Sequence, residues 1–501
     1  MDGSSPEVRT GAGAVRGAAE GTLAVFRGIP YARPPVGELR FAAPAPPVPW
    51  DGVREATAFG SPPPQSALLP TLAPPAPPGA DPDDWLTVNV WTPSLGAEAG
   101  LPVMVWIYGG AYRLGTSSQP SYDGTRLAEL GVVVVTFNHR LGVEGFAELA
   151  GKPANRSLLD DVAALRWVHE NIAAFGGDPG QVTVFGESAG AGAVASLLVM
   201  PSAAGLFGRA IAQSMPGVFL TPELAGDVTK AVAAQEGIPA TTEAFAAADP
   251  AVLAAASDRV WAREHPAWGQ LTFVDTPFAP VVDGEVLPCA PWRALATGTG
   301  RNIDLIVGHN RDEYRLFLEF AGLRGTITEE MAVRALRGLV PPIPGADGEK
   351  AYRAAYPDAG PEELYELVLS DWVFRMPSLH LAQSHAVGGG RTFLYELTYE
   401  SRLLGACHAL DIPLVFGTNA ELGEFLLGDR PAPQALALGD LMRAEWVAFA
   451  RTGDPGWPAY SVGRRLTRVY SADSDVRPYP ENASMHVWDQ RRFDVLDLAH
   501  H

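Results

Sequence analysis

Four short apolar runs predict strands that are covered on both faces. They occupy residues 103–107, 132–136, 182–185 and 303–307, and most of their residues are Val, Ile or Leu. None of them alternates strictly between apolar and polar positions, as a strand with one solvated face would. We therefore expect these runs to lie inside a mostly parallel sheet.

The segment between the second and third runs has the spacing of a buried helix. Over residues 158–175, Val162, Leu165 and Ile172 fall on one wide apolar face. The sequence Gly176-Gly177-Asp178-Pro179 then ends the helix. Because strand and helix alternate here, we expect helices on both faces of the sheet.

Later parts of the chain predict insertions on this sheet. Helical stretches follow at residues 225–236, 244–256, 329–339 and 361–381. The Pro- and Ala-rich stretch 61–82 is expected to be an ordered surface loop rather than a domain linker, because sheet-like sequence lies on both sides of it. We predict one domain over residues 1–501, with inserted helical segments at roughly 219–300 and 315–390.

Composition narrows the possible partners. The 501 residues include 37 Lys and Arg against 57 Asp and Glu, a formal charge of −20, which disfavours binding to nucleic acid. No apolar run is long enough to span a bilayer. The first residues lack the basic and apolar regions of a secretion signal, so we expect a cytoplasmic protein, although a secreted protein without its signal would look the same. Cys289 and Cys407 could form one disulfide at most.

The sequence Gly186-Glu187-Ser188-Ala189-Gly190 carries the first chemical signal. It follows the apolar run 182–185 and precedes a stretch of small, helix-compatible residues. A serine on such a strand-to-helix turn presents its hydroxyl above the sheet, and glycines leave room for the cramped backbone. The motif predicts acyl transfer through a serine ester. A Gly- and Ser-containing loop that opens a helix would give the same pattern, so Ser188 needs partners.

A serine nucleophile needs a histidine base, a carboxylate beside the histidine, and backbone N–H donors for the oxyanion. His408 is a candidate base in a loop of small residues, although a lone histidine there is more often structural. Asp312 and Glu313 both follow the strand that ends at Val307, and spacing alone does not choose between them. Such a base would titrate near ~6.5 if its pKa is unperturbed.

The N–H donors are expected after another strand. The strand that ends at Ile107 runs into Tyr108-Gly109-Gly110-Ala111-Tyr112, whose small residues allow close backbone approach. A simple glycine turn is the alternative interpretation. The amide of Ala189, next to the serine, is the expected second donor.

These segments resemble the type-B carboxylesterase/cholinesterase family of α/β-hydrolases, in particular its bacterial and para-nitrobenzyl-esterase-like members. The similarity runs in order through nearly the whole chain. Besides the segments around Glu313 and His408, the matching stretches are residues 26–32, 86–93, 106–112, 138–142, 171–179, 184–191 and 209–214. The resemblance implies an α/β-hydrolase fold: a twisted, mostly parallel sheet with helices on both faces and helical insertions that form a gorge.

Carried over by position, the resemblance implies three groups of residues, and neither a cofactor nor a metal. The catalytic group comprises Ser188 as nucleophile, Glu313 as acid and His408 as base, with Asp312 as a structural neighbour. The oxyanion donors are the backbone N–H groups of Gly110, Ala111 and Ala189. The polar groups near the triad are Glu187 and Ser214. For Glu187 and Ser214, a structural hydrogen-bonding role is as well supported as a kinetic one.

The chain also departs from the family pattern. Tyr108 stands where the family often has His, and Asp83-Asp84-Trp85-Leu86 lacks the cysteine of a family disulfide. Tyr314 replaces the glycine that follows the catalytic acid, which we expect to alter backbone freedom there. The loop that carries a choline-binding tryptophan in cholinesterases has no clear counterpart. The family's cholinesterase activity is therefore not expected.

We predict a serine carboxylesterase that acts on a small-molecule ester and is a monomer or homodimer. An amide, carbamate or thioester hydrolase would use the same groups, and a non-catalytic scaffold of this fold is the remaining alternative. Five residues are plausible in the substrate pocket or, equally, in the core: Tyr112, Met215, Phe317, Trp372 and Phe374.

Overall fold

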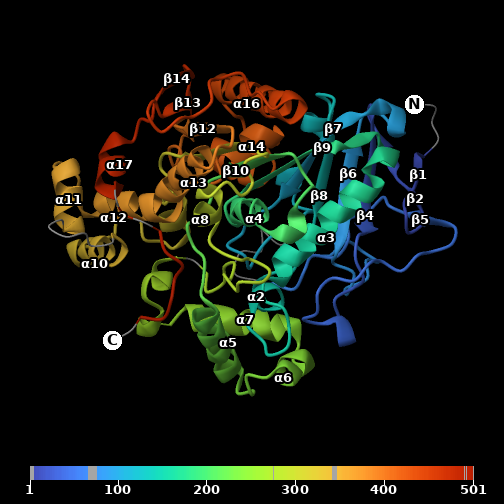
Figure 1. The fold of residues 1–501 in the computed structure, drawn as a ribbon, viewed down its shortest axis with the longest axis horizontal. Coiled ribbons are helices and arrows are strands. Elements are labelled where there is room, and N and C mark those ends of the chain that lie inside the picture. Colours follow the sequence, from blue (N-terminus) through green and yellow to red (C-terminus); the bar gives the residue numbers. More distant parts are fainter. Residues whose placement is uncertain are drawn as a thin grey trace.

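The computed structural model describes residues 5–65, 76–263, 265–274, 276–340, 347–489, 491 and 493–499. Within these residues, an eleven-stranded sheet has the order β14-β13-β12-β11-β10-β9-β7-β8-β6-β4-β3 (Figure 1). In chain order its strands are β3 (Ala18–Glu20), β4 (Leu23–Pro30), β6 (Thr87–Thr92), β7 (Leu101–Ile107), β8 (Val133–Phe137), β9 (Gly177–Glu187), β10 (Arg209–Gln213), β11 (Asp304–Asn310), β12 (Thr392–Leu397), β13 (Leu466–Tyr470) and β14 (Asp475–Pro478). A separate three-stranded sheet contains β1 (Glu7–Arg9), β2 (Ala14–Arg16) and β5 (Val53–Glu55).

The middle of the large sheet is parallel, as predicted. Strands β8, β7, β9, β10, β11, β12 and β13 all pair in parallel, whereas β3, β4, β6 and β14 join antiparallel at the two edges. The carboxyl ends of the parallel strands therefore lie along one side of the sheet. On open α/β sheets, this is the side where ligands bind.

Helices cover both faces of the sheet, which explains why its strands do not alternate. In β7, Val105 and Ile107 pack in the cluster that includes α3 (Arg156–Asn171), α4 (Ala189–Leu197) and α13 (Met376–Val387). Its neighbours Met104 and Trp106 pack in the opposite cluster with α1 (Thr125–Ala128), α14 (Asp411–Phe416) and α16 (Pro433–Thr452). All four of these β7 side chains are fully buried, as the sequence pattern predicted.

Two of the predicted helices are interrupted. The stretch 244–256 forms two helices, α6 (Thr242–Ala247) and α7 (Pro250–Trp261). Asp249 separates them because a residue before proline avoids the helical region, and its side chain caps α7 by accepting from Ala251 N–H at 2.8 Å. The stretch 361–381 likewise contains α12 (Pro361–Ser370), a π-helical turn (Asp371–Arg375) and the start of α13.

The other predicted helices have the expected positions. The segment 158–175 is α3 followed by a 3₁₀ helix (Ile172–Phe175), which ends at Gly176 with φ 87°. Residues 225–236 lie in α5 (Pro222–Glu236), and residues 329–339 form α10 (Glu329–Leu339). Of the predicted surface loop, residues 61–65 and 76–82 contain neither helix nor strand, and residues 66–75 lie outside the described residues.

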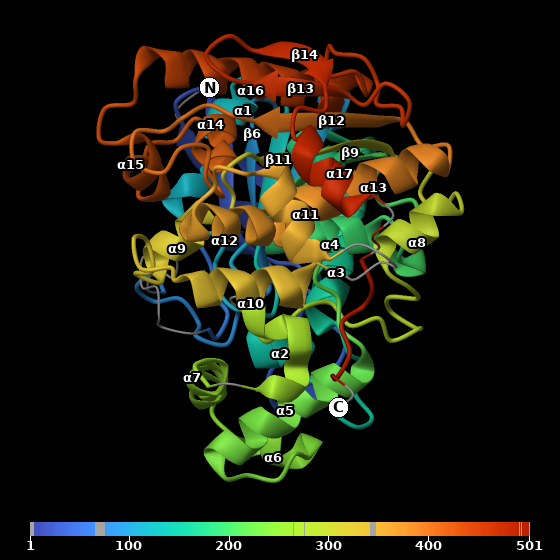
Figure 2. The ribbon, with the colours of Figure 1, turned by 90° about the vertical axis from the view of Figure 1, so that its left-hand side faces the viewer.

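The helices of the two segments predicted as insertions have different positions, because α13 packs on a face of the sheet whereas others lie away from it. Figure 2 shows α5, α6 and α7 together at the end of the molecule farthest from β13 and β14. Among the described residues, the remaining α-helices are α2 (Gly142–Phe146), α8 (Pro291–Ala296), α9 (Arg315–Phe320), α11 (Gly348–Ala355), α15 (Leu422–Leu427) and α17 (Asn482–Trp488). None of the helices in the described part of the chain is both long and apolar enough to cross a membrane.

A buried ion pair joins the loop after β8 to α3. Arg140 Nη2 lies 2.7 Å from Asp160 Oδ1, and both side chains are fully buried. Asp160 Oδ2 also accepts from the Arg140 backbone N–H at 3.0 Å. Removing one member of such a pair leaves an uncompensated charge in the core.

We expect Asp160→Ala to lower the free energy of unfolding by about 3–5 kcal/mol, measured by urea denaturation. The matched control is Asp494→Ala, which removes the carboxylate of an exposed pair with Arg293. Exposed pairs contribute little, so the control should unfold at nearly the wild-type urea concentration. Equal destabilisation of the two variants would contradict the role given to the buried pair.

Candidate active site

Ser188 lies on a tight turn between β9 and α4. Its backbone has φ 56° and ψ −124°, and its N–H donates to Gln213 O on the neighbouring strand at 2.9 Å. The flanking glycines are required by close contact. A Cβ at Gly190 would lie 2.0 Å from Ile107 O, and one at Gly186 would lie 2.7 Å from the same oxygen. The turn lies between a strand and a helix, as the motif predicted, and it is pressed against the end of β7.

His408 and Glu313 meet beside this turn, although 95 residues separate them in the chain. His408 Nδ1 lies 2.5 Å from Glu313 Oε2, and Glu313 Oε1 accepts from Asn310 N–H at 2.8 Å. Both side chains are buried. The carboxylate that contacts the imidazole is thus that of Glu313, the residue that spacing alone did not choose over Asp312.

The other ring nitrogen of His408 faces Glu187. His408 Nε2 lies 3.0 Å from Glu187 Oε1, within ion-pair distance but without hydrogen-bond alignment. A third carboxyl group, Asp411, is fully buried three residues after His408 and accepts from Gln213 Nε2 at 2.8 Å. Sequence reasoning gave Asp411 and Gln213 no role, although each lies close in the chain to a candidate residue, Asp411 to His408 and Gln213 to Ser214.

These carboxyl groups change the proton affinity of the imidazole. Burial lowers the pKa of His408, but the charges of Glu187 and Glu313 and the hydrogen bond to Glu313 outweigh it and raise the pKa above its ordinary value of 6.5. Burial also raises the pKa of Glu187 to about 8, against the opposing charge of His408. His408 is therefore expected to titrate at a higher pH than the value of 6.5 for an unperturbed histidine.

The glycine loop after β7 lies directly against Ser188. A Cβ at Gly109 would lie 2.9 Å from Ser188 Cβ, and Gly110 has φ 115°. Ala111 has φ 54°, in the left-handed region, so its N–H is held in a turn rather than in a strand. Within the described chain, the N–H groups of Gly110 and Ala111 have no hydrogen-bond acceptor. Ala189 is the first residue of α4, where an amide has no acceptor in its own helix.

Ser214 lies at the end of β10, next to this turn. Its backbone has φ 53°, and its N–H donates to Gly308 O at 2.8 Å. Its side chain is fully buried, and Oγ has no hydrogen-bond partner among the described residues.

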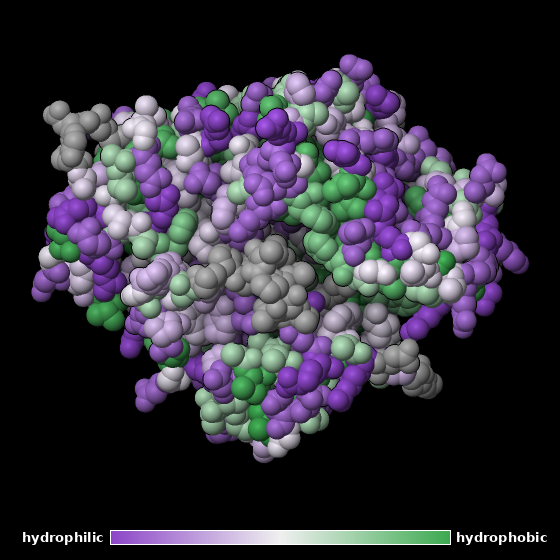
Figure 3. Space-filling model, turned by 180° about the vertical axis from the view of Figure 1, so that it is seen from behind, coloured by the Kyte–Doolittle hydropathy of each residue, from purple (hydrophilic) through white to green (hydrophobic). Residues whose placement is uncertain are grey.

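A cavity of about 420 Å³ opens above Ser188 and His408. Its walls are mostly apolar, and Phe374 and Phe317 place their ring centres 4.3 Å and 5.0 Å from the His408 ring. Seen from behind the view of Figure 1, the surface shows apolar side chains gathered beside a hollow (Figure 3).

The cavity tests the five candidate pocket residues. Tyr112, Phe317 and Phe374 line it, whereas Trp372 and Met215 are buried elsewhere in the core. Sequence reasoning missed further apolar wall residues, which include Leu114, Tyr122, Val218, Phe320, Ile412 and Leu422.

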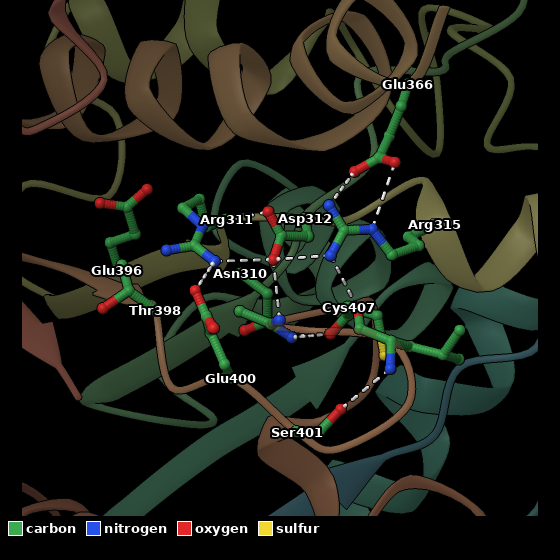
Figure 4. Close-up of polar contacts among 12 residues, drawn as sticks. Asn310, Arg311, Asp312, Arg315, Glu366, Glu396, Thr398, Glu400, Ser401 and Cys407 are labelled. Atoms are coloured by element: carbon green, nitrogen blue, oxygen red, sulfur yellow. Dashed lines mark hydrogen bonds and ion pairs between the residues drawn. The ribbon is translucent and has the colours of Figure 1, made fainter. Parts of the chain in front are cut away.

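Asp312 joins the loop of Glu313 to the loop of His408 (Figure 4). Its Oδ2 accepts from Ala406 N–H at 2.9 Å, and its own N–H donates to Ala406 O at 2.9 Å. The guanidinium groups of Arg311 and Arg315 lie 3.0 Å and 3.3 Å from the same carboxylate oxygen. Although burial raises the pKa of Asp312, these two cations hold it below its usual range.

The structure also bears on the cysteines and on the positions where the chain departs from the family pattern. Cys289 and Cys407 are free, so the possible disulfide is not formed. Tyr314 has φ −76° in the ordinary helical region, so the observed backbone does not require the glycine that the family has at this position. Tyr108 stacks on His139 with ring centres 4.5 Å apart. Among the described residues, no group of three or more His, Cys, Asp or Glu side chains is arranged to hold a metal ion.

Comparison with known proteins gives matches along nearly the whole chain. A sequence profile of the carboxylesterase family matches residues 4–474. Para-nitrobenzyl esterase of Bacillus subtilis (strain 168) is 37% identical over 495 residues, which cover 95% of this chain and 96% of that protein. Carboxylesterase 1D of Rattus norvegicus is 33% identical over 517 residues, with coverage of 94% and 89%.

The structural comparison agrees with the sequence comparison. The crystal structure of a carboxylesterase from Geobacillus stearothermophilus superposes with a TM-score of 0.84 at 36% identity, covering 96% of this chain and 99% of that chain. The chain therefore belongs to the carboxylesterase family, and it has the α/β-hydrolase fold.

Proposed function

We propose that Ser188, His408 and Glu313 carry out the carboxylic ester hydrolysis for which the family is named. One observation carries this assignment. The 2.5 Å contact between His408 Nδ1 and Glu313 Oε2 lies beside a serine held on a strained turn at the base of an apolar cavity. A buried imidazole that is oriented by a carboxylate is the base that a serine hydroxyl needs.

The proposed reaction has two halves. Ser188 Oγ attacks the ester carbonyl while His408 Nε2 accepts the hydroxyl proton. The N–H groups of Gly110, Ala111 and Ala189 then stabilise the oxyanion, because their hydrogen bonds are aimed where negative charge develops. His408 returns the proton to the departing alcohol. Water then hydrolyses the acyl-enzyme by the same transfers in reverse.

Glu187 is proposed to stabilise the imidazolium that forms when His408 takes the proton. Its Oε1 lies 3.0 Å from Nε2, the nitrogen that receives that proton. The negative charge of Glu187 therefore favours the protonated ring, but it also keeps the resting ring protonated up to higher pH. For Ser214, the buried hydroxyl next to the Ser188 turn is compatible with a supporting role only.

Asp312 is proposed to position the base. Through Ala406 it fixes the backbone two residues before His408, and it directly precedes Glu313. Its carboxylate also pairs with Arg311 and Arg315, whose other carboxylate partners are Glu400 and Glu366 respectively. A small displacement of a catalytic group is costly, because the reaction depends on close alignment.

We further propose that residues 1–501 form one domain, with insertions at roughly 219–300 and 315–390 that wall the cavity. The cavity supports this, because its walls include residues of both segments, among them Val274 and Phe317. The enzyme is proposed to work as a monomer or homodimer on a small-molecule ester, since one chain supplies every group named above.

We expect Ser188→Ala to lower kcat for ester hydrolysis by roughly 10⁴-fold or more, because no nucleophile remains to form the acyl-enzyme. The measurement is the steady-state hydrolysis of a small ester by purified, folded protein. Ser202→Ala, which changes a serine outside the cavity, is the matched control and should keep kcat within about twofold. Retention of more than a tenth of wild-type kcat by Ser188→Ala would overturn the mechanism.

We expect kcat/KM to fall with decreasing pH through an apparent pKa above 6.5, because a raised pKa keeps His408 protonated, and therefore inactive as a base, up to higher pH. Glu187→Gln should move this acid limb to lower pH by removing a charge that favours imidazolium. Glu400→Gln, at a carboxylate with a 73% exposed side chain, should leave the limb in place. A wild-type limb at or below 6.5 would contradict this electrostatic account.

We expect Asp312→Ala to lower kcat by roughly 10- to 100-fold with a smaller effect on KM. The reason is that His408 loses its alignment, whereas the pocket that binds the substrate is unchanged. Asp312→Asn keeps an acceptor for Ala406 N–H and should lose less. Glu400→Ala removes the exposed partner of Arg311 but leaves Asp312 intact, and serves as the control. Unchanged kcat in Asp312→Ala would show that the joined loops do not need this side chain.

A further inference from the structure

The three proposed oxyanion donors come from two separate elements. Gly110 and Ala111 lie in the loop after β7, whereas Ala189 is the first residue of α4. One oxyanion can accept from donors on both elements only when the loop and the helix are held at a fixed separation. A residue that contacts both elements can therefore control whether the donors converge.

The loop is held against the nucleophile at its first residues. A Cβ at Gly109 would lie 2.9 Å from Ser188 Cβ, so the loop begins in direct contact with the Ser188 turn. The loop then closes on itself, because Leu114 N–H donates to Gly110 O at 2.9 Å. The contact at Gly109 lies two residues before Ala111, so a second contact is required to fix the far side of the loop.

Tyr112 provides a contact between this part of the loop and α4. It directly follows Ala111, has φ 59°, and is buried. A Cβ added at Gly192 on α4 would lie only 2.0 Å from Tyr112 Oη, so the hydroxyl fills the space that a side chain at Gly192 would take. Tyr112 Oη has no hydrogen-bond partner among the described residues. The hydroxyl therefore meets the helix through close packing.

Gly192 belongs to the helical turn that begins at the nucleophile. Its N–H donates to Ser188 O at 3.0 Å, and its carbonyl oxygen accepts from Ser196 Oγ at 2.8 Å. The contact between Tyr112 and Gly192 thus joins the residue after Ala111 to the backbone that carries the nucleophile.

Tyr112 is also supported from its other side, by α2. Its carbonyl oxygen accepts from Gly142 N–H at 2.7 Å, and its ring packs at 74° to the Phe146 ring with centres 5.4 Å apart. Tyr112 is therefore enclosed between α2 and α4, and a displacement of its side chain would be passed to the neighbouring Ala111.

We propose that Tyr112 is a positioning residue for ester hydrolysis, and that its hydroxyl, packed on Gly192, sets the separation between the oxyanion loop and α4. This inference rests on the proposed function, because it concerns the oxyanion donors of the same Ser188 site. It predicts that a change at this contact lowers the rate of acyl transfer, since an error of about 1 Å in alignment can cost roughly 10²-fold.

A cycle of three variants tests the contact with methyl heptanoate as substrate. Gly192→Ala places a methyl group where the hydroxyl lies, and should lower kcat roughly 10²-fold. Tyr112→Phe removes the hydroxyl but keeps the ring on Phe146, and should lower kcat less than about tenfold. In the double variant the methyl group takes the space that the hydroxyl leaves, so kcat should recover to within about tenfold of the wild type. Because Tyr112 also lines the cavity, KM is measured for each variant and should stay within about threefold.

A second measurement separates positioning from a loss of folded enzyme. Hexyl trifluoromethyl ketone has the same acyl chain as methyl heptanoate. Ser188 Oγ adds to its carbonyl carbon, the hydroxyl proton passes to His408, and the former carbonyl oxygen becomes an oxyanion. Its inhibition constant should rise in parallel with the fall in kcat across the cycle, because both depend on the oxyanion donors. Partial unfolding would lower kcat without changing the inhibition constant.

Two matched controls change the same residue types outside the cavity. Gly226→Ala, within α5, adds a Cβ that comes no nearer than 3.9 Å to Glu148 Cγ. Tyr356→Phe removes a hydroxyl that bonds to Ser484 Oγ. Each control should keep kcat within about twofold of the wild type and leave the inhibition constant of the ketone unchanged.

Two outcomes would overturn the proposal: a double variant as slow as Gly192→Ala, or a Gly192→Ala enzyme with the wild-type kcat and inhibition constant. If Gly192→Ala does not fold, alone or in the double variant, Tyr112→Leu decides. It removes the ring and the hydroxyl and should lower kcat at least about tenfold, with a parallel rise in the inhibition constant. Wild-type values in Tyr112→Leu would then overturn the proposal. Failure of the proposed function is recognised separately, as absence of ester hydrolysis by the wild type or as hydrolysis that survives Ser188→Ala.

Discussion

The contact between the Ser188 turn and the end of β7 is the constraint on which the site depends. At Gly190 the backbone of this turn approaches Ile107 O so closely that no side chain fits. The same approach brings Gly109 and the loop after it against Ser188. The proposed nucleophile and two N–H groups without acceptors among the described residues therefore come together through backbone packing, before any side-chain hydrogen bond is considered. The buried, doubly covered sheet makes this possible, because it holds the ends of β7 and β9 rigidly side by side.

Charge is the second constraint, because one imidazole lies among three buried carboxyl groups. Glu313 orients the ring, Glu187 faces its other nitrogen, and Asp411 is held by Gln213 and Tyr395. Such a cluster costs free energy unless its members are protonated, paired or hydrogen-bonded. The raised pKa values of His408, Glu187 and Asp411 show how the protein balances it. Asp312 does not add to this free-energy cost, because its carboxylate is paired with Arg311 and Arg315 rather than placed beside the imidazole.

Sequence patterns predicted those structural features that are determined by residues close to one another in the chain. The run 103–107 gave a buried strand, and the five residues around Ser188 gave a strand-to-helix turn, because both are determined by nearby residues. Proline and glycine were harder to interpret, and Pro250 divides a stretch that was predicted as one helix. Contacts between distant segments had no local signal. Spacing could not choose Glu313 over Asp312, nor indicate that Gln213 would hold Asp411. The family resemblance supplied the first of these but not the second.

The origin of each part of the site suggests how reaction and selectivity are separated in this fold. Ser188 directly follows β9, Glu313 lies shortly after the end of β11, and His408 lies in the loop that precedes α14. The cavity walls come instead from the segments between strands, where Val274, Tyr314 and Phe374 contact the space above the serine. Packing on the sheet resists change at the reacting groups, whereas a wall residue such as Tyr314 is fixed by a few contacts of its own. Substrate preference can therefore change at the wall while the geometry of acyl transfer stays the same.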